Sequence, residues 1–133
     1  MPILVDTNIL LDIVKDDPTW ADWSFSHLNA AVHSDRVFIN AIIYAELSVA
    51  FDRVEILDAM LQRMPALVAE IPRAALFLAG RTFVKYRARS GRKSGVLPDF
   101  FIGAHAAVSR CALLTRDVGR YRTYFPRVEL IAP

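Results

Sequence analysis

The sequence predicts an α/β fold with three layers, in which helices cover both faces of a central parallel sheet of four to five strands. Two observations support this prediction. Short apolar runs of strand length alternate along the chain with longer segments whose apolar residues recur at helical spacing. The length of 133 residues suffices for one buried core but not for two, so we expect a single domain spanning residues 1–133.

The N-terminal part of the chain predicts a buried strand followed by two helices. Residues 3–5 are an apolar run that ends at Asp6, and apolar residues then recur at helical intervals over residues 9–14. Asp17 and Pro18 have the order of an N-cap and a first-turn proline, so a second helix is expected to begin there. Asp6 is thus expected where the first strand gives way to the first helix.

A second strand and its helix follow. Residues 36–39 predict a strand, and Asn40 is placed to cap the next helix, in which Glu46 is surrounded by apolar residues. Residues 52–64 form a further amphipathic segment, and residues 67–68 form a short extended one. Glu46 is therefore expected about two turns inside a helix.

The rest of the chain continues the alternation of helices and strands. The predicted elements are a long helix at residues 72–89, a polar glycine-containing loop at 91–95, a helix at 100–110 begun by Pro98 and Asp99, and strands at 112–115 and 128–131. Strands that alternate with helices imply a parallel sheet with both faces covered.

The composition is apolar, with 54% hydrophobic residues and a mean hydropathy of +0.30, and such a composition is compatible with a membrane-spanning segment. The most apolar stretches, residues 41–51 and 95–108, are interrupted by polar residues and are shorter than a membrane-spanning helix. The first residues have no basic start and soon reach an acid, unlike a secretory signal. We therefore expect no membrane segment and a cytoplasmic location.

Cysteine and arginine usage limits the classes of site. Cys111 is the only cysteine, so an internal disulfide and a cysteine-built zinc site are excluded. Only three of the 16 basic residues are lysines, within a formal net charge of +2. Arginine suits phosphate and carboxylate partners because its planar guanidinium makes paired hydrogen bonds. Genomic base composition explains the excess equally well, so it does not identify a partner.

Four acidic residues lie where the predicted sheet brings distant segments together. In an open parallel sheet, functional side chains gather at the carboxyl ends of the strands. Asp6 ends the first strand, Asp99 stands in the first turn of its helix, and Asp117 follows the strand at 112–115. Glu46 has a side chain long enough to reach inward from its helix. We expect these four carboxylates to share one pocket.

Such a pocket requires a cation, because carboxylates close together in a partly dry cleft repel one another and raise each other's pKa. Oxygen ligands without cysteine or paired histidines favour Mg²⁺, with Mn²⁺ as the alternative. A divalent cation activates water and stabilises charge on phosphate oxygens. The pattern therefore predicts phosphodiester hydrolysis.

Four short motifs surround these acids. They are Asp-Thr-Asn at 6–8, Ala-Ile-Ile-Tyr-Ala-Glu-Leu at 41–47, Pro-Asp-Phe-Phe-Ile-Gly-Ala-His-Ala at 98–106 and Leu-Leu-Thr-Arg-Asp at 113–117. In this order they resemble the motifs of the PIN domain, and most closely those of VapC-type toxins of toxin–antitoxin pairs. The resemblance covers nearly the whole chain and shows no departure at the four acids.

The resemblance implies a PIN-like fold and an endoribonuclease that cleaves single-stranded regions of RNA with Mg²⁺ or Mn²⁺. The family's catalytic, metal-binding positions are matched by Asp6, Glu46, Asp99 and Asp117. Polar positions that support the site are matched by Thr7, Asn8 and Thr115. The family also implies a cognate VapB-type antitoxin, acidic or hydrophobic where it binds, and a homodimer.

Each acid also has a purely structural interpretation. Asp6 and Asp99 stand where an aspartate stabilises the start of a helix, and Asp117 stands where a turn residue would. Glu46 is harder to explain in this way, because a charge in an apolar helix needs a partner or a cation. The alternative functions are a non-toxin PIN nuclease, a catalytically idle RNA- or protein-binding PIN module, and a phosphatase of the haloacid dehalogenase type, which would need an aspartate at Asn8.

Two surfaces are candidates for binding partners. A basic stripe, which is either a solvated face or a contact to RNA phosphates, comprises Arg81, Lys85, Arg89, Arg92 and Lys93. An apolar surplus that predicts an antitoxin or dimer groove comprises Tyr44, Leu47, Phe51, Val54, Leu57 and Met60.

Three further expectations concern single residues. Arg116, beside Asp117, is the best single candidate for touching substrate. His105 is expected to be packed and hydrogen-bonded rather than a ligand. The other acids are expected mostly on exposed faces or at caps, with a place near the pocket rim as the alternative for Asp12 and Asp22.

Overall fold

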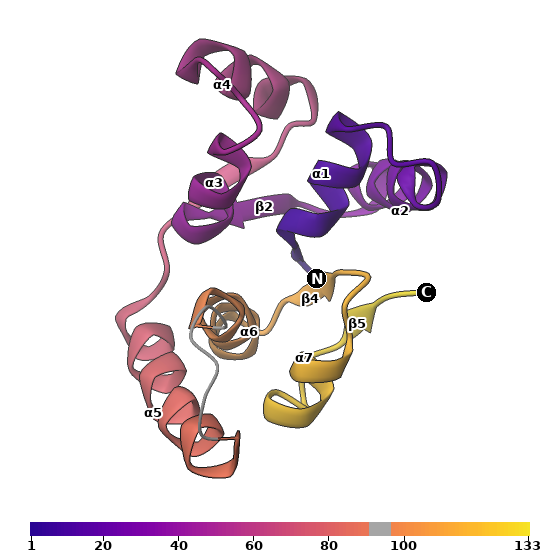
Figure 1. The fold of residues 1–133 in the computed structure, drawn as a ribbon. Coiled ribbons are helices and arrows are strands. Elements are labelled where there is room, and N and C mark those ends of the chain that lie inside the picture. Colours follow the sequence, from indigo (N-terminus) through magenta and orange to yellow (C-terminus); the bar gives the residue numbers. More distant parts are fainter. Residues whose placement is uncertain (91–96) are drawn as a thin grey trace.

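The structure is a computed structural model that describes residues 1–90 and 97–133 (Figure 1). Its elements are β1 (Ile3–Val5), α1 (Thr7–Val14), α2 (Ala21–Ser34), β2 (Val37–Asn40), α3 (Ala41–Ser48), α4 (Val54–Arg63), β3 (Leu67–Ala69), α5 (Arg73–Ser90), α6 (Leu97–Ser109), β4 (Ala112–Leu114), α7 (Gly119–Tyr124) and β5 (Leu130–Ile131). The predicted loop at 91–95 lies outside the described residues.

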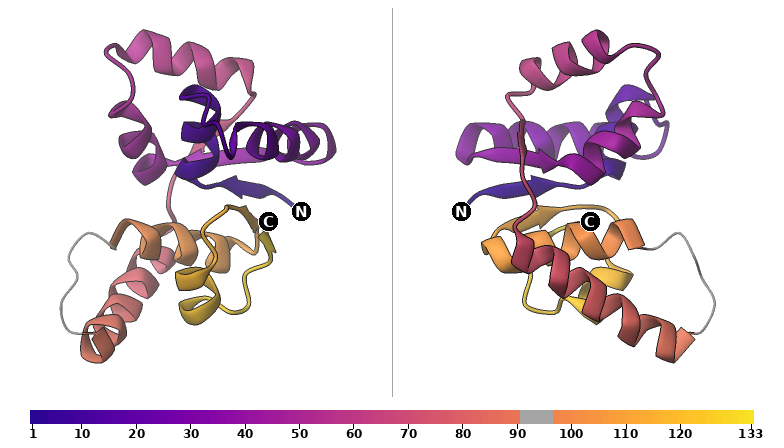
Figure 2. Two further views of the ribbon diagram at one scale, coloured as in Figure 1. Left: turned by 45° about the vertical axis from the view of Figure 1, so that its right-hand side comes forward. Right: turned by 90° about the vertical axis from the view of Figure 1, so that its left-hand side faces the viewer.

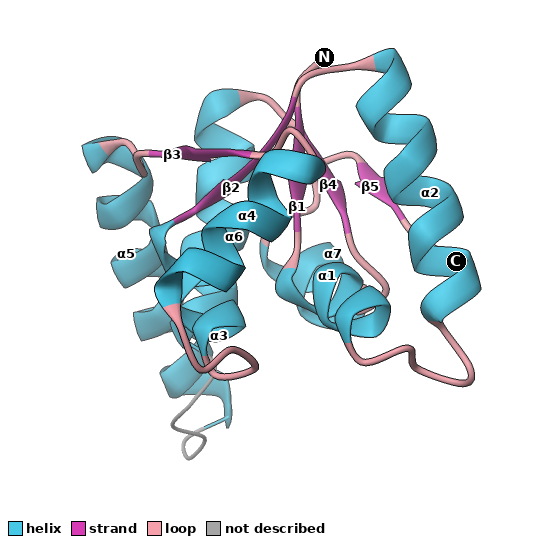
Figure 3. Ribbon diagram, turned by 90° about the horizontal axis from the view of Figure 1, so that it is seen from above, coloured by secondary structure: helices cyan, strands magenta, loops and turns pink. Residues whose placement is uncertain are grey.

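The five strands form one sheet in the order β3-β2-β1-β4-β5, and every pairing is parallel (Figure 3). The central strands β1, β2 and β4 are buried along their whole length. The predicted parallel sheet is therefore confirmed. Because the strands run in the same direction, their carboxyl ends lie at one edge of the sheet, where α1, α3, α5 and α7 follow β1, β2, β3 and β4.

Helices cover both faces of this sheet. In Figure 1 and in the turned views of Figure 2, α1 to α4 lie on one side of the strands and α5 to α7 lie on the other. Fully buried side chains come from the strands and from the inward faces of the helices, and they include Leu4, Ile39, Phe100 and Leu113. This is the predicted three-layer arrangement.

Two polar residues at strand ends begin helices, in agreement with the sequence. Asp6 caps α1, because its Oδ1 accepts a hydrogen bond from the backbone N–H of Thr7 at 2.8 Å. Asn40 ends β2 and caps α3, because its Oδ1 accepts from the backbone N–H of Ile43 at 3.0 Å. Both caps turn the chain directly from strand to helix at the carboxyl edge.

Some local predictions are wrong in detail. Asp17 does not begin α2 directly, because its Oδ1 accepts from the backbone N–H groups of Thr19 and Trp20, each at 2.9 Å, in a turn before the helix. Strands β4 and β5 are shorter than expected. Helix α7 was not predicted, because its sequence, GRYRTY, has no helical pattern of apolar residues.

His105 is packed and hydrogen-bonded, as expected. It is 2% exposed, its Nδ1 lies 3.1 Å from Nδ2 of Asn40, and burial lowers the pKa of its ring. The amide nitrogen can only donate, so the ring nitrogen accepts, and the bond ties α6 to the end of β2.

In the described part of the chain, no helix combines the length and the apolar character that crossing a bilayer requires.

Candidate metal-binding acidic site

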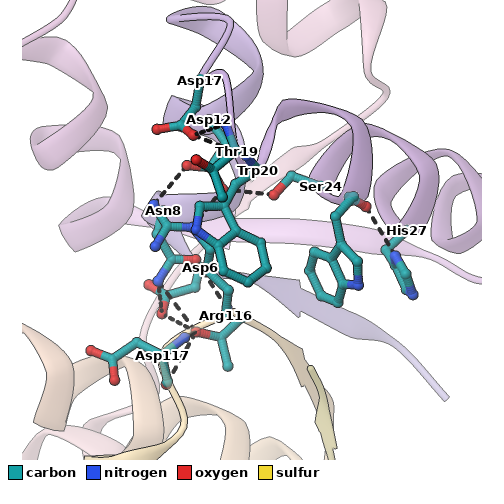
Figure 4. Close-up of polar contacts among 12 residues, drawn as sticks. Asp6, Asn8, Asp12, Asp17, Thr19, Trp20, Ser24, His27, Arg116 and Asp117 are labelled. Carbon is teal, nitrogen blue, oxygen red and sulfur yellow. Dashed lines mark hydrogen bonds and ion pairs between the residues drawn. The ribbon is translucent and has the colours of Figure 1, made fainter. Parts of the chain in front are cut away.

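Asp6 is the buried centre of the candidate site and is 4% exposed. Its Oδ1 accepts from the N–H of Thr7, and its Oδ2 accepts from Thr115 Oγ1 at 2.8 Å, Tyr121 OH at 3.0 Å and Asn8 Nδ2 at 3.3 Å. Figure 4 shows Asp6 with Asn8 beside it. Among the described residues, all these donors are neutral. They orient the carboxylate but do not supply a positive charge.

The surroundings of Asp6 disfavour its ionised form. Burial raises the pKa of the Asp6 carboxyl to about 6, the charge of Asp99 acts in the same direction, and the hydrogen bonds oppose the rise. Burial, together with the charges of Asp6 and Asp99, also holds the pKa of the Tyr121 hydroxyl far above its ordinary value, so this group remains a donor. A buried acid with a raised pKa in such a position is a candidate functional group.

Glu46 is connected to Asp6 through Thr7. The backbone N–H of Thr7 donates to Asp6, and its hydroxyl donates to Oε1 of Glu46 at 2.6 Å. Glu46 is half-buried, and it lines a hollow of about 360 Å³ with Thr7, Leu11, Lys15, Val49 and Ala50. A single threonine therefore links the acids that follow the neighbouring strands β1 and β2.

Asp99 and Asp117 complete the set of four acids. Asp99, in the first turn of α6, forms an ion pair with Arg120 of α7. Burial raises the pKa of Asp99, Arg120 opposes the rise, and the charge of Asp117 adds to it. Asp117 is exposed beside Asp6 in Figure 4, and its backbone N–H donates to Oγ1 of Thr115 at 3.1 Å. The four acids thus lie at one edge of the sheet.

The acids are near one another without forming a closed cage. Among residues 1–90 and 97–133, no three acidic, histidine or cysteine side chains are arranged to hold a metal ion as they stand. Instead, Thr7 holds Glu46, and Arg120 holds Asp99. Carboxylate oxygens are nevertheless the kind of ligand that Mg²⁺ and Mn²⁺ prefer, and burial raises the pKa of both Asp6 and Asp99, so their ionised forms would gain from a bound cation. The donor chemistry therefore fits a hard divalent cation.

Arg116, the expected substrate contact, has a partner within the chain. Its Nε and Nη2 donate to the two carboxylate oxygens of Asp12, each at 2.7 Å, and its guanidinium lies 5.3 Å from the centre of a Trp20 ring (Figure 4). Asp12 is 3% exposed and also accepts from Ser24 Oγ at 2.7 Å. The expectation of an exposed face or a cap is therefore wrong for Asp12, because residues distant in sequence cover it.

Two residues of α7 that contact the acids were not predicted from the sequence. Tyr121 donates to Asp6, and Arg120 pairs with Asp99. The available signal was their closeness in sequence to Asp117, which they follow by three and four residues. That signal is only meaningful once a helix is known to begin at Gly119.

The two candidate partner surfaces are present in part. Arg81, Lys85 and Arg89 are exposed on α5, while Arg92 and Lys93 lie outside the described residues. A hollow of about 120 Å³ beside α3 and α4 is lined by Tyr44, Ser48, Phe51, Asp52, Arg53, Val54 and Leu57. Leu47 and Leu57 are buried in the core, so this part of the predicted surface is wrong. A larger hollow, of about 580 Å³, contains none of the four acids.

Comparisons with known proteins agree with this architecture. The PIN domain family matches residues 3–126. The fold is similar to that of VapBC2 from Rickettsia felis bound to a promoter DNA fragment (TM-score 0.74, 21% identity, covering 99% of this chain and 98% of that chain). It is also similar to VapBC-1 from nontypeable Haemophilus influenzae (TM-score 0.70, 21% identity, 99% and 98%) and to FitAcB from Neisseria gonorrhoeae (TM-score 0.68, 19% identity, 96% and 95%). No curated protein matches the sequence.

Proposed function

The chain belongs to the PIN-domain family, whose members are nucleases, and from this membership we propose that it is a metal-dependent endoribonuclease that cleaves single-stranded RNA. The observation that supports the proposal most is the environment of Asp6. This carboxylate is 4% exposed, is held by neutral donors among the described residues, and lies beside three further acids at the edge of the sheet where catalytic groups gather.

In this proposal Asp6 and Asp99, with Glu46 and Asp117, hold Mg²⁺ or Mn²⁺. The bound cation supplies an activated water and stabilises charge on the phosphate oxygens. The chain itself orients the ligands: Thr115 and Tyr121 fix one oxygen of Asp6, and Thr7 fixes Glu46. These bonds reduce the reorganisation required when substrate binds.

We further propose that residues 1–133 act as a single PIN domain in the cytoplasm, as a VapC-type toxin paired with a cognate VapB-type antitoxin and assembled as a homodimer. The similarity to VapBC and FitAB structures supports an antitoxin partner. The hollow beside α3 and α4 supports an apolar contact, because Val54 at its edge is 56% exposed. The exposed Arg81, Lys85 and Arg89 support binding to RNA phosphates.

The first test replaces the central acids one at a time. We expect Asp6→Asn and Asp99→Asn to lower RNA cleavage by at least about a hundredfold. Substitution of residues that hydrogen-bond to metal ligands typically lowers activity about ten- to hundredfold, and loss of a ligand itself should have a larger effect. The readout is cleavage of single-stranded RNA by the purified protein with Mg²⁺ or Mn²⁺. Asp22→Asn, an exposed acid on α2, is the matched control and should cleave normally.

Chelation completes the test. EDTA should silence the wild-type protein, and either metal should restore it. Undiminished cleavage by Asp6→Asn would reject the assignment of the acids. RNA binding without cleavage by the wild-type protein would favour the idle binding module instead. Sequencing of RNA ends after induction of the wild-type protein and Asp6→Asn identifies the RNA that is cut.

A further inference from the structure

Arg120 is a cation that pairs directly with one of the four acids. It stands on α7, three residues after Asp117, and its Nη1 pairs with Oδ2 of Asp99 on α6. The Arg120 guanidinium also lies 5.8 Å from the centre of the ring of Tyr86, a residue of α5 that is 6% exposed. Three helices therefore determine where this charge resides.

The Arg120 pair differs from an ordinary structural ion pair. Its two side chains are 27% and 30% exposed, and the carboxylate that it uses is one of the proposed metal ligands. A guanidinium and a divalent cation cannot both occupy the same side of Oδ2 of Asp99, because they carry like charges and would be in contact. A partly exposed pair of this kind separates at a modest cost.

We infer that Arg120 is a resident counter-ion of the acidic site that competes with the divalent cation for Asp99. The inference rests on the proposed function only in requiring that the acids bind a divalent cation. Before the cation binds, Arg120 offsets part of the repulsion among the acids. When the cation binds Asp99, the hydrogen bond between Arg120 and Oδ2 of Asp99 breaks. The guanidinium stays near the acids because it belongs to α7 and lies against the Tyr86 ring.

The opposite role makes the opposite prediction. If Arg120 served to hold Asp99 in position for the cation, its removal would weaken cation binding. If the pair were only a surface contact, its removal would leave cation binding unchanged. The sign of the change in affinity therefore separates the three possibilities without any measurement of RNA cleavage.

The test is Mn²⁺ binding by calorimetry to the purified protein without RNA. We expect Arg120→Gln to bind Mn²⁺ roughly three- to fivefold more tightly than the wild-type protein, as for loss of a partly screened ion pair. Arg122→Gln removes the same charge from an exposed position of the same helix and controls for long-range effects. It should change the affinity by less than about twofold.

Two additional variants test whether the effect of Arg120 depends on Asp99 and on the loss of its charge. In an Asp99→Asn background, Arg120→Gln should no longer tighten binding, because the contested carboxylate is gone. If Arg120→Gln folds poorly, Arg120→Lys replaces it. The lysine ammonium is more strongly hydrated than a guanidinium and cannot make paired hydrogen bonds to a carboxylate. The Arg120→Lys variant should therefore bind Mn²⁺ more tightly than the wild-type protein.

The outcomes distinguish this inference from the proposed function. Wild-type binding of Mn²⁺ with unchanged or weaker binding by Arg120→Gln overturns the competition and leaves the nuclease proposal intact. Absence of Mn²⁺ binding in both the wild-type protein and Arg120→Gln overturns both. Tighter binding by Arg120→Gln that also persists in the Asp99→Asn background assigns the effect to general charge and overturns the inference.

Discussion

Two aspartates, one that caps the start of α1 and one in its last turns, are similarly buried but have different partners. Asp6 is 4% exposed and Asp12 is 3% exposed. Asp12 receives two hydrogen bonds from the guanidinium of Arg116, each at 2.7 Å, and one from Ser24. Asp6 receives only neutral donors among the described residues, and burial raises its pKa to about 6. Figure 4 shows Asp12 with Ser24 and Arg116, and Asp6 with Asn8.

The difference separates a structural acid from a candidate functional one. Burying a carboxylate is costly, and the fold offsets this cost at Asp12 with an arginine. At Asp6 no arginine offsets the cost of burying the ionised carboxylate. A cation that binds there from solution would therefore stabilise this carboxylate. The Asp12–Arg116 pair also joins α1 to the segment after β4, and it thereby positions Asp117, the next residue along the chain.

The largest expected effect comes from breaking the Asp12 pair. Arg116→Met should lower the free energy of unfolding by about 3 to 5 kcal/mol, because it leaves a buried carboxylate without its cation. Urea denaturation at neutral pH measures the change. Arg122→Met, an exposed arginine on α7, is the matched control and should stay within about 0.5 kcal/mol of the wild-type protein.

A second substitution tests whether the uncompensated charge is the cause. Asp12→Asn combined with Arg116→Met should recover much of the lost stability, because no buried charge remains and Asn can still bond with Ser24. A double variant that is less stable than Arg116→Met alone would show that packing against Trp20, rather than charge, explains the loss.

The next effect concerns pH and should occur at Asp6. The pKa of Asp6 is about 6 in the folded protein, above its ordinary value of 3.8, so the folded state binds the proton more tightly than the unfolded state. The metal-free protein should therefore lose stability as pH rises from about 4 to above 6, and the loss should remain at higher pH. The expected amount is roughly 2 to 3 kcal/mol, as for a shift of about two pKa units.

Asp6→Asn isolates this contribution from other titrating groups. The free energy of unfolding of Asp6→Asn should fall less with pH than that of the wild-type protein, so the two curves diverge between pH 4 and 7. Mn²⁺ at pH 7.5 should stabilise the wild-type protein and have little effect on the variant. Parallel curves in the absence of metal would mean that folding does not raise the pKa of Asp6.

The sequence was sufficient for the parts of the fold that depend on local patterns. Apolar runs located the strands, and Asp6 and Asn40 were recognised at the junctions where each strand meets its helix. The parallel arrangement then placed Asp6, Glu46 and Asp117 at one edge, since every such strand directs its carboxyl end the same way, whereas Asp99 stands at the start of α6, which follows α5 rather than a strand.

The missing parts depend on contacts between distant segments. Periodicity cannot show that Arg116 covers Asp12, because 104 positions separate them. It also missed α7, a six-residue helix whose sequence is mostly polar or aromatic. Arg120 and Tyr121 consequently escaped notice, although they contact two of the four acids. The sequence therefore located the acids and their neutral donors Thr7, Asn8 and Thr115, but not Arg120 and Tyr121.

The smallest expected effect concerns one of those groups, Tyr121. Tyr121→Phe removes one of the donors to Oδ2 of Asp6, a bond of 3.0 Å, and should raise the pKa of Asp6 above about 6. At pH 7.5 the free energy of unfolding should fall by about 1 kcal/mol, and at pH 5 by less, because Asp6 is then largely protonated. Urea denaturation at both pH values and an NMR titration of the carboxyl carbon measure these changes.

Tyr124→Phe is the matched control, because Tyr124 lies on the same helix and packs its ring against Tyr86 and Phe100. Its pKa and stability profiles should follow those of the wild-type protein. If Tyr121→Phe lost the same stability at pH 5 and pH 7.5, the hydroxyl would contribute packing rather than support for a charge. A pH-dependent loss, in contrast, would show that Tyr121 of α7 lowers the pKa of Asp6, the buried acid that has no cationic partner among the described residues.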